Sequence, residues 1–322
     1  MKMAILGAGK IAEIMATTIA HMDRVECYAV GARELTRAQD FAARHGFQKA
    51  YGSYEDMLQD DGIDLVYIAT PHSHHYDSIK LCLEHGKNVL CEKTFTVNAS
   101  QAREVLQLAK EKNLLLTEAI WTRYTPMRKV LDEIIDSGVI GKVHSITANL
   151  CYVLNHLERN KKPELAGGAL LDLGVYPLNF ACMVIKEQVK DIKAFAVMNE
   201  YGVDDSNCMY LTFENGATAV LHSNQLVASE RGGYVYGTEG YVVAENINNV
   251  QGYKVFNKNH ELIKEYRVPK QITGYEYEVE ACMEALENGW LECPAMPHAE
   301  TVRMMEIMDS IRELWGLKYP ME

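Results

Sequence analysis

The sequence of 322 residues predicts an α/β protein in two parts: a doubly wound parallel sheet, followed by an α+β domain with a large, mostly antiparallel open sheet. Two observations carry this prediction. Before residue 120, short apolar runs alternate with helical patterns, which requires parallel strands with helices on both faces. From Lys142 onward the apolar period is two, and Asn215-Gly216 between two apolar runs is typical of a hairpin.

The first strand and helix are joined by a glycine turn. Residues 4–6 are apolar, Gly7 and Gly9 allow a tight turn, and a helical pattern begins at Lys10. Ala12 takes the third position of a Gly-x-Gly-x-x-Gly/Ala fingerprint, which serves close packing of helix on strand. The free N–H groups of the helix N-terminus suit a pyrophosphate. We therefore predict a dinucleotide site of the Rossmann type that includes Gly7, Gly9, Lys10, Ile11 and Ala12.

The second strand is predicted at residues 25–31 and the next helix at 34–44. An acidic side chain at the end of this strand would bind the adenosine ribose and repel a 2′-phosphate. The strand ends instead in Gly31-Ala32-Arg33, and Arg33 and Arg37 lie four apart on one helical face. Two guanidinium groups at this place favour NADP over NAD, although a solvated helix face would explain the same pair.

The third predicted strand, residues 64–70, is continuously apolar and ends at Pro71-His72-Ser73-His74-His75. A helix start precedes it, with Ser53 as the cap and Asp56 in the first turn. The three histidines raise the question of a metal site. No cysteine or carboxylate accompanies them at ligand spacing, so we predict no metal and favour helix capping or ligand contact.

The fourth strand delivers a lysine to the same edge of the sheet. After a helix at 76–85, residues 87–91 form the strand and run into Glu92-Lys93-Thr94. Ligands of open parallel sheets bind outside the carboxyl ends of the strands, so Lys93 is expected in the cofactor crevice. A helix at 100–112 and a strand at 114–118 complete this part of the chain.

The second part contains a helix with two residues that could carry chemistry. It is predicted at 172–185, after the flexible Gly167-Gly168 pair, and Asp172 and Tyr176 lie four apart on one of its faces. From spacing alone, an aspartate cap and a half-buried tyrosine are the simpler interpretation. The tail at 298–317 carries apolar residues at near-helical spacing and is expected to be core.

Composition limits the classes of function. Lys and Arg number 32 against 44 Asp and Glu, a formal charge of −12, so nucleic acid and anionic membranes are unfavourable partners. The eight cysteines form no Cys-x-x-Cys pair and indicate free thiols in a reducing compartment. No run approaches the ~18 apolar residues of a membrane span, and a strand beginning by residue 2 leaves no room for a signal peptide. We expect a cytoplasmic protein with a small-molecule substrate.

These motifs resemble those of the glucose-fructose oxidoreductase and inositol dehydrogenase (Gfo/Idh/MocA) family. The likeness covers essentially the whole chain and is strongest to residue 180. The matching segments are 7–12, Ala69-Thr70-Pro71 with His75, 86–93 and, for the dimeric dihydrodiol dehydrogenase branch in particular, 118–124 and 167–176. Thr94 stands where the family has proline. Tyr176 stands where most members have histidine, as it does in that branch.

The resemblance implies hydride transfer between a nicotinamide cofactor and a carbinol carbon of a cyclic polyol, sugar or trans-dihydrodiol. It implies catalytic roles for Lys93, Asp172 and Tyr176, and cofactor contacts for Thr70, Pro71, His72, His75, Glu92 and Lys93. Tyr176 becomes an acid/base at neutral pH where a neighbouring ammonium such as Lys93 lowers its pKa, and Lys93 is the alternative proton donor. Asp172 would orient the pair or bind a substrate hydroxyl.

The expected domains are residues 1–120 for NADP binding and 121–322 for substrate binding and dimerisation. Trp121 and Arg123 follow this boundary, where an aromatic wall and a fixed cation suit a ring-shaped, hydroxylated substrate, although domain packing would also explain Trp121. An exposed face of the second sheet would suit self-association, and the resemblance implies a homodimer. The competing function is a non-catalytic NADP-binding sensor on the same fold, against which Lys93, Asp172 and Tyr176 argue.

Overall fold

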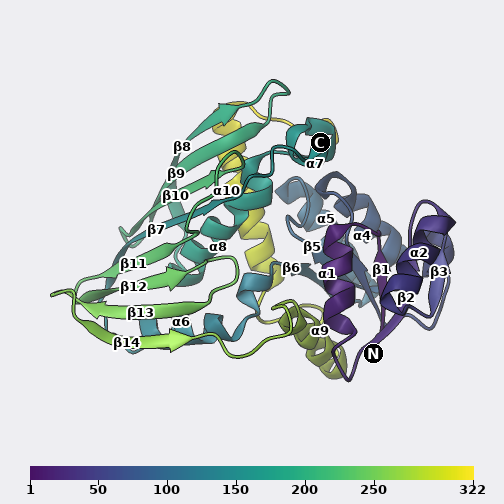
Figure 1. The fold of residues 1–322 in the computed structure, drawn as a ribbon. Helices are drawn as coiled ribbons and strands as arrows, with labels where there is room; N and C mark the ends of the chain where they lie inside the picture. The colour runs from purple at the N-terminus through teal and green to yellow at the C-terminus, as the bar shows by residue number, and fades with distance from the viewer. The chain divides into compact units, whose positions relative to one another are not determined.

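The computed structural model describes residues 1–322 and divides into two compact units, each built around one sheet. The first unit comprises Met1–Ile120 and Gln271–Val302. The second comprises Trp121–Lys270 and Arg303–Glu322. Figure 1 labels helices and strands of both units.

The sheet of the first unit has six strands in the order β3-β2-β1-β4-β5-β6, and every pair is parallel. The order reverses between β1 and β4, which is the switch point of a doubly wound sheet. The predicted fold class is therefore confirmed for this part of the chain. The strands are β1 (Lys2–Leu6), β2 (Glu26–Gly31), β3 (Lys49–Tyr51), β4 (Leu65–Ile68), β5 (Asn88–Glu92) and β6 (Leu116–Ala119).

Helices connect these strands. In the first unit α1 packs beside α2 and α4 beside α5, and the reversal of strand order places the two pairs on opposite faces. Ser53 caps α3 as predicted, because its side chain accepts a hydrogen bond from the Asp56 amide at 3.1 Å. The helices are α1 (Lys10–Ile19), α2 (Leu35–His45), α3 (Tyr54–Leu58), α4 (His75–Glu84), α5 (Ala99–Lys112) and α9 (Glu276–Asn288), with a 3-10 turn η1 (His72–His74).

The first unit is discontinuous in sequence, unlike the predicted division at residue 120. Residues 271–302 pack against the first sheet, where backbone groups of its edge strand need partners. The Leu116 amide donates to the Leu291 carbonyl at 3.1 Å, and His298 Nε2 lies 2.8 Å from the Leu116 carbonyl oxygen. The Thr18 and Thr273 hydroxyls are 2.7 Å apart. The chain leaves the first unit after Ile120 and returns to it for residues 271–302, which do not belong with the second sheet.

The sheet of the second unit has eight strands in the order β14-β13-β12-β11-β7-β10-β9-β8. All pairs are antiparallel except β7 with β10, so the prediction of a mostly antiparallel open sheet is confirmed. Asn215-Gly216 lies in the β9–β10 hairpin, as predicted. The strands are β7 (Val143–Cys151), β8 (Val189–Met198), β9 (Asp204–Phe213), β10 (Thr218–Asn224), β11 (Gly233–Gly237), β12 (Gly240–Glu245), β13 (Gly252–Asn257) and β14 (Leu262–Arg267).

One face of the second sheet packs on helices. Figure 1 shows α8 and α10 on the same side of it, and Ile146, Ala148 and Leu150 of β7 are buried while the residues between them are partly exposed. The period of two read from the sequence therefore separates a covered face from an open one. The helical elements are η2 (Trp121–Arg123), α6 (Pro126–Asp136), α7 (Glu158–Lys161), η3 (Pro163–Leu165), η4 (Leu170–Gly174) and α8 (Val175–Val184), together with α10 (His298–Trp315), which belongs to this unit from Arg303 onward.

The helix predicted at 172–185 starts earlier and with a different winding. A π-helical turn, Leu170–Gly174, runs directly into α8. The helical stretch Pro163–Val184 is long and apolar enough to cross a membrane by length and composition, although Asp172 and Asn179 interrupt its apolar residues. Inside the protein 94% of its apolar window is buried, as in a core helix.

Candidate functional site

The glycine turn after β1 has the geometry that the fingerprint predicts. Gly7 has φ +105°, and a Cβ there would lie 3.0 Å from the Ala69 carbonyl oxygen. Its amide donates to the Gly31 carbonyl at 2.9 Å. Only glycine combines this backbone conformation with so close an approach to the neighbouring strand end.

The start of α1 offers unsatisfied amides next to open space. Gly9 is the N-cap residue and supplies no side-chain cap, and the first helical hydrogen bond runs from the Glu13 amide to the Gly9 carbonyl at 3.1 Å. The preceding amides of Lys10–Ala12 therefore have no partner inside the helix. A Cβ built at Gly9 meets nothing within 4 Å. These residues fit the pyrophosphate of a dinucleotide.

Arg33 and Arg37 lie on the exposed side of the segment that follows β2. Arg37 reaches back to the glycine turn, where its Nη2 donates to the Ala8 carbonyl at 3.0 Å. Tyr54 interacts electrostatically with both arginines. Burial raises the pKa of Tyr54, and the positive charges of Arg33 and Arg37 oppose that shift. Sequence reasoning missed Tyr54, whose only signal is its place just after the Ser53 cap.

The loop after β4 carries both an available hydroxyl and a buried histidine. Thr70 Oγ1 is buried without a hydrogen-bond partner, so it can serve a ligand. His75 is fully buried, with Nδ1 2.8 Å from the Thr94 carbonyl and Nε2 2.9 Å from the Thr70 carbonyl. It joins the loops after β4 and β5. Pro71 is exposed and His72 is buried beside it.

Glu92 and Lys93 end strand β5 at the same edge of the sheet. The Glu92 carboxylate is buried, accepts the Tyr67 hydroxyl on one oxygen, and accepts the Lys93 amide on the other at 3.2 Å. Glu92 thus organises the backbone that presents Lys93. The Lys93–Thr94 peptide bond is cis. No group of three or more His, Cys, Asp or Glu side chains is placed to hold a metal ion.

Asp172 and Tyr176 lie on consecutive turns of the helix in the second unit. The Asp172 carboxylate is buried, accepts from Asn160 Nδ2 at 2.7 Å, and lies 3.3 Å from Arg159 Nη1. Tyr176 is 7% exposed, at the first turn of α8. Asn160 and Arg159 were not predicted, because their contact with Asp172 depends on the folded loop and has no local pattern.

Trp121 and Arg123 form the 3-10 turn η2 and are both buried. Arg123 Nε donates to Asn179 Oδ1 at 2.6 Å, and Asn179 Nδ2 donates to the Val175 carbonyl at 2.8 Å. This chain of bonds fixes the first turn of the helix that carries Tyr176. Arg123 therefore has a supporting contact within the second unit that the sequence did not reveal.

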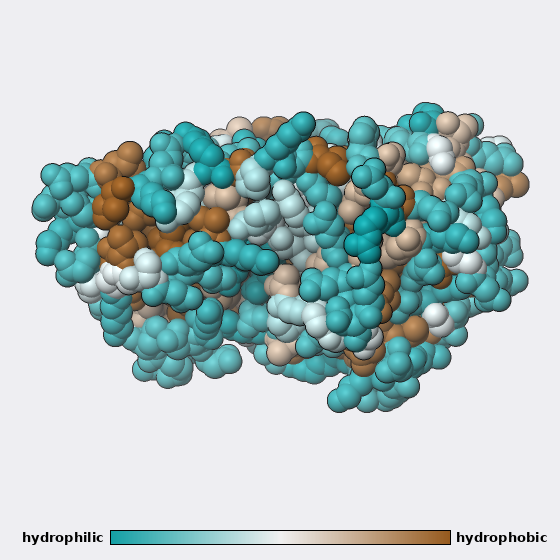
Figure 2. Space-filling model, turned by 90° about the horizontal axis from the view of Figure 1, so that it is seen from below, coloured by the Kyte–Doolittle hydropathy of each residue, from teal (hydrophilic) through white to brown (hydrophobic).

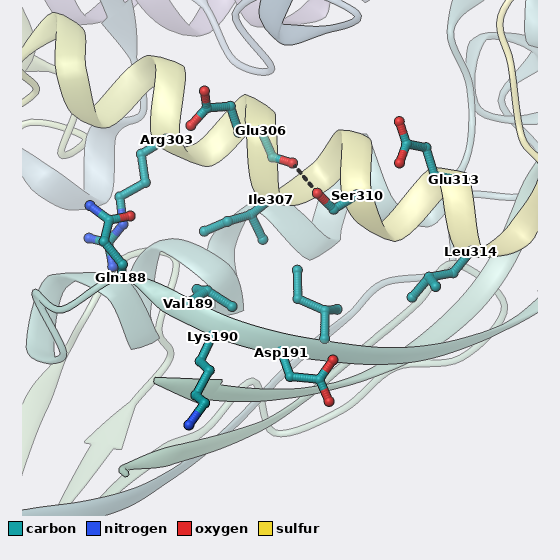
Figure 3. A pocket seen from close by; sticks show the side chains of 11 residues that line it. Gln188, Val189, Lys190, Asp191, Arg303, Glu306, Ile307, Ser310, Glu313 and Leu314 are labelled. Atoms are coloured by element: carbon teal, nitrogen blue, oxygen red, sulfur yellow. Dashed lines mark hydrogen bonds between the residues drawn. The ribbon is translucent and has the colours of Figure 1, made fainter. Parts of the chain in front are cut away.

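Strand topology brings the predicted cofactor residues to one edge of one unit, since β1, β2, β4 and β5 are parallel and all end there. The candidates from Trp121 onward lie in the second unit. A separate cavity of about 420 Å³ lies between β8 and α10 and contains none of the predicted residues. Figure 3 shows its lining, including the Ser310 hydroxyl donating to the Glu306 carbonyl at 2.9 Å.

Comparisons with known proteins cover both units. Residues 1–120 match the family model described as "Oxidoreductase family, NAD-binding Rossmann fold", and residues 129–243 match that of the GFO/IDH/MocA C-terminal domain. Two curated relatives, from Xenopus tropicalis and Homo sapiens, are trans-1,2-dihydrobenzene-1,2-diol dehydrogenases, each 32% identical. The alignments cover 99% and 100% of this chain and 99% of each relative.

Solved structures share the fold. A 3-ketoreductase from Actinomadura kijaniata, in complex with NADP and TDP-benzene, has a TM-score of 0.88 at 24% identity and covers 97% of both chains. A levoglucosan dehydrogenase in complex with NADH has a TM-score of 0.88 at 18% identity and covers 98% of this chain and 97% of its own. The resemblance inferred from the sequence motifs is thereby confirmed. The chain belongs to the Gfo/Idh/MocA family and is an NAD(P)-dependent oxidoreductase.

Proposed function

We propose that this protein oxidises or reduces a carbinol carbon of a cyclic polyol, sugar or trans-dihydrodiol, with NADP as the preferred cofactor. The observation that carries the proposal is the full-length likeness, at 32% identity, to trans-1,2-dihydrobenzene-1,2-diol dehydrogenases. The geometry of each unit supports it. The first presents an anion cradle, and the second holds a buried carboxylate and a tyrosine on adjoining helical turns.

The residues at the start of α1 and at the carboxyl ends of the parallel strands would hold the cofactor, which when bound would supply hydride transfer to or from the carbinol carbon. The hydroxyl proton must leave as the carbonyl forms, and either Tyr176 as its phenolate or Lys93 as its neutral amine accepts it. Asp172 orients this group or binds a second substrate hydroxyl. Its hydrogen bond from Asn160 at 2.7 Å fixes the carboxylate, which suits a residue that must keep one position.

The first experiment is turnover itself. The protein is incubated with NADP⁺ and a panel of sugars, inositols and trans-dihydrodiols, and the absorbance of the reduced cofactor is followed. We expect turnover with at least one cyclic diol. Tight NADP binding without turnover on any member of the panel would favour the non-catalytic sensor.

Replacement of Tyr176 by Phe tests the proton transfer. Removal of an acid/base group costs about 100-fold or more in rate, and affinity for NADP should stay nearly unchanged. Tyr253→Phe is the matched control, since Tyr253 is another buried tyrosine of the second unit, in strand β13. Equal losses of turnover and cofactor affinity in the Tyr176 variant would mean that this tyrosine is structural.

Cofactor choice is tested at Arg33. Strand β2 ends in glycine with no carboxylate, and two exposed arginines follow. Loss of one charge-assisted contact to a 2′-phosphate should weaken NADP by about tenfold or more, and NAD far less. Arg44→Ala is the control, because Arg44 is an exposed arginine of α2 that pairs with Glu13 at 2.7 Å. Equal effects on both cofactors would refute the phosphate contact.

A homodimer through the open face of the second sheet is part of the proposal. Phe195 is 77% exposed and Val197 61%, and the register places Tyr210 and Val220 on the same face. Such an apolar surface suits a second copy of the chain. Figure 2, seen from the side of β14, shows a further hydrophobic area among hydrophilic side chains.

Light scattering of the purified protein tests the oligomeric state. Phe195→Arg should yield monomers, whereas Leu314→Arg, at a 55% exposed leucine of α10, should leave the dimer intact. A dimer that survives Phe195→Arg would exclude this face. We also propose a cytoplasmic location, because all eight cysteines are free thiols, and fractionation of a tagged protein tests it.

A further inference from the structure

Asp204, the first residue of β9, binds the start of the π-helical turn from a distant part of the chain. Its side chain is fully buried. Oδ2 accepts from the Leu170 amide at 2.8 Å and from Asn207 Nδ2 at 2.8 Å. Leu170 begins the π-turn, and its N-cap residue, Ala169, supplies no side-chain cap. Asp204 thus performs the capping that the local sequence cannot.

The Gly167-Gly168 pair makes room for this contact. Gly168 has φ +113°, and a Cβ there would lie 2.3 Å from Asp204 Oδ1. A Cβ at Gly167 would lie 2.8 Å from the Asn160 carbonyl group. The sequence marked these two glycines as a flexible pair before the helix. In the structure, Asp204 and Asn160 occupy the positions that side chains at Gly168 and Gly167 would need.

The same contacts continue to Asp172. The Gly168 amide donates to the Asn160 carbonyl at 3.0 Å, and Asn160 Nδ2 donates to Asp172 Oδ2 at 2.7 Å. The Asp172 amide in turn reaches the Gly168 carbonyl at 3.4 Å. The loop before the helix, the helix start and the Asp172 carboxylate are therefore fixed as one cluster, and Asp204 joins that cluster to the sheet.

We infer that Asp204 is a positioning residue for the reaction: its carboxyl group fixes the helix start that presents Asp172 and Tyr176. The inference rests on the proposed function for the roles of those two residues. Asp204 contacts no reacting atom in this scheme. It acts by holding the helix start against β9, and a displacement of about 1 Å at a reacting group costs about 100-fold in rate.

Either protonation state of Asp204 can make this contact. Burial, reinforced by the neighbouring Asp205, raises the pKa of Asp204 to about 7. Tyr319, whose hydroxyl donates to the Gly167 carbonyl at 2.7 Å, is the other titratable group nearby, with Arg312 over its ring. A protonated carboxyl still leaves an oxygen to accept from the Leu170 amide. An asparagine can do the same, so Asp204→Asn is the conservative variant.

The test compares Asp204→Ala with Asp204→Asn in the full chain. We expect the alanine variant to lose roughly ten- to 100-fold in kcat with an unchanged KM for NADP, and the asparagine variant to recover most of it. Met209→Ala is the control, since Met209 is a fully buried residue of the same strand whose side chain makes none of the hydrogen bonds at the helix start. An equal kcat loss in Met209→Ala, or a kcat within twofold of the wild type in Asp204→Ala, overturns the inference.

A second measurement is independent of activity. Hydrogen exchange of the peptide covering 169–174 should accelerate in Asp204→Ala and stay slow in Met209→Ala. If Tyr176→Phe keeps full turnover, the catalytic assignment fails while this exchange experiment still tests the contact. If Asp204→Ala does not fold, Gly168→Ala tests the same contact, because its methyl group displaces Asp204 Oδ1. Unaltered exchange in the folded variant overturns the inference.

Discussion

The replacement Glu278→Gln should make the protein more stable at neutral pH, and increasingly so as the pH rises. Glu278 of α9 is fully buried, and neither of its carboxyl oxygens has a hydrogen-bond partner. Burial, together with the nearby Glu92 carboxylate, raises the pKa of Glu278 well above its usual value. Glu92 has donors on both oxygens. Glu278 is therefore the member of the pair that keeps its proton in the folded state.

The size of the effect follows from proton counting. An unfolded glutamate titrates near pH 4.3, and a folded carboxyl group that stays protonated from about pH 5.5 to 7.5 makes folding take up one proton over this range. The stability that the protonated form contributes is present below the unfolded pKa and is lost as the pH rises. Each pH unit costs about 1.4 kcal/mol, or about 2.7 kcal/mol over this range. Glutamine has the same shape and takes up no proton on folding, so the free energy of unfolding of the variant should not decrease with pH in this way.

Calorimetric unfolding at the two pH values measures the difference. At roughly 2–4 °C per kcal/mol for units of this size, the melting temperature of the variant should gain roughly 5–11 °C on the wild type between pH 5.5 and 7.5. Glu284→Gln, at an exposed glutamate of the same helix, should show no such trend. A stability difference for Glu278→Gln that is equal at both pH values would show that the native carboxyl group is ionised.

Other perturbations give separable results. Gly9→Ala should leave the melting temperature unchanged and weaken NADP binding, measured by fluorescence titration, because its methyl group enters the open space at the start of α1. Gly7→Ala should weaken binding and also lower stability by about 1–3 kcal/mol, since φ is +105° there. Asp60→Asn should lower the free energy of unfolding at pH 7 by about 1–3 kcal/mol. Burial alone would raise the pKa of the Asp60 carboxyl group. Hydrogen bonds from Lys49 at 2.6 Å and Tyr51 at 2.7 Å outweigh burial and hold this pKa below its usual range. The ionised Asp60 carboxylate stabilises the folded state at pH values above the pKa of an unfolded aspartate. The difference in unfolding free energy between the wild type and Asp60→Asn, measured in urea, should therefore shrink as the pH falls below about 4.

The sequence predicted those parts of the fold that depend on local pattern. Continuous apolar runs located β1, β2, β4 and β5, and the period of two located the second sheet. The edge strand β3, Lys49–Tyr51, was missed because three residues carry too little periodicity. Residues 271–302 were predicted in the wrong unit, because the sequence pattern of a helix such as α9 shows which of its faces is buried but not which sheet that face packs against.

The residues of the candidate site likewise fall into those that local pattern and topology predict and those that they do not. Residues at the carboxyl ends of parallel strands could be predicted, because topology alone brings Gly7, Arg33 and Lys93 to one edge. Partners held by long-range contacts could not. Asn160 meets Asp172 only after the preceding loop has folded, and Asp204 meets Leu170 across 34 positions of sequence. Neither contact leaves a local signal.

The discontinuity of the first unit also constrains how the protein is made. Its last segment ends at Val302, and the second unit is completed only by Arg303–Glu322. Almost the entire polypeptide must therefore leave the ribosome before either unit has all its parts. Domain-by-domain folding during translation, the usual route for chains with two units, therefore cannot complete either unit early, and a nascent chain that stops at residue 120 lacks the contacts that Leu291 and His298 make with the edge of β6.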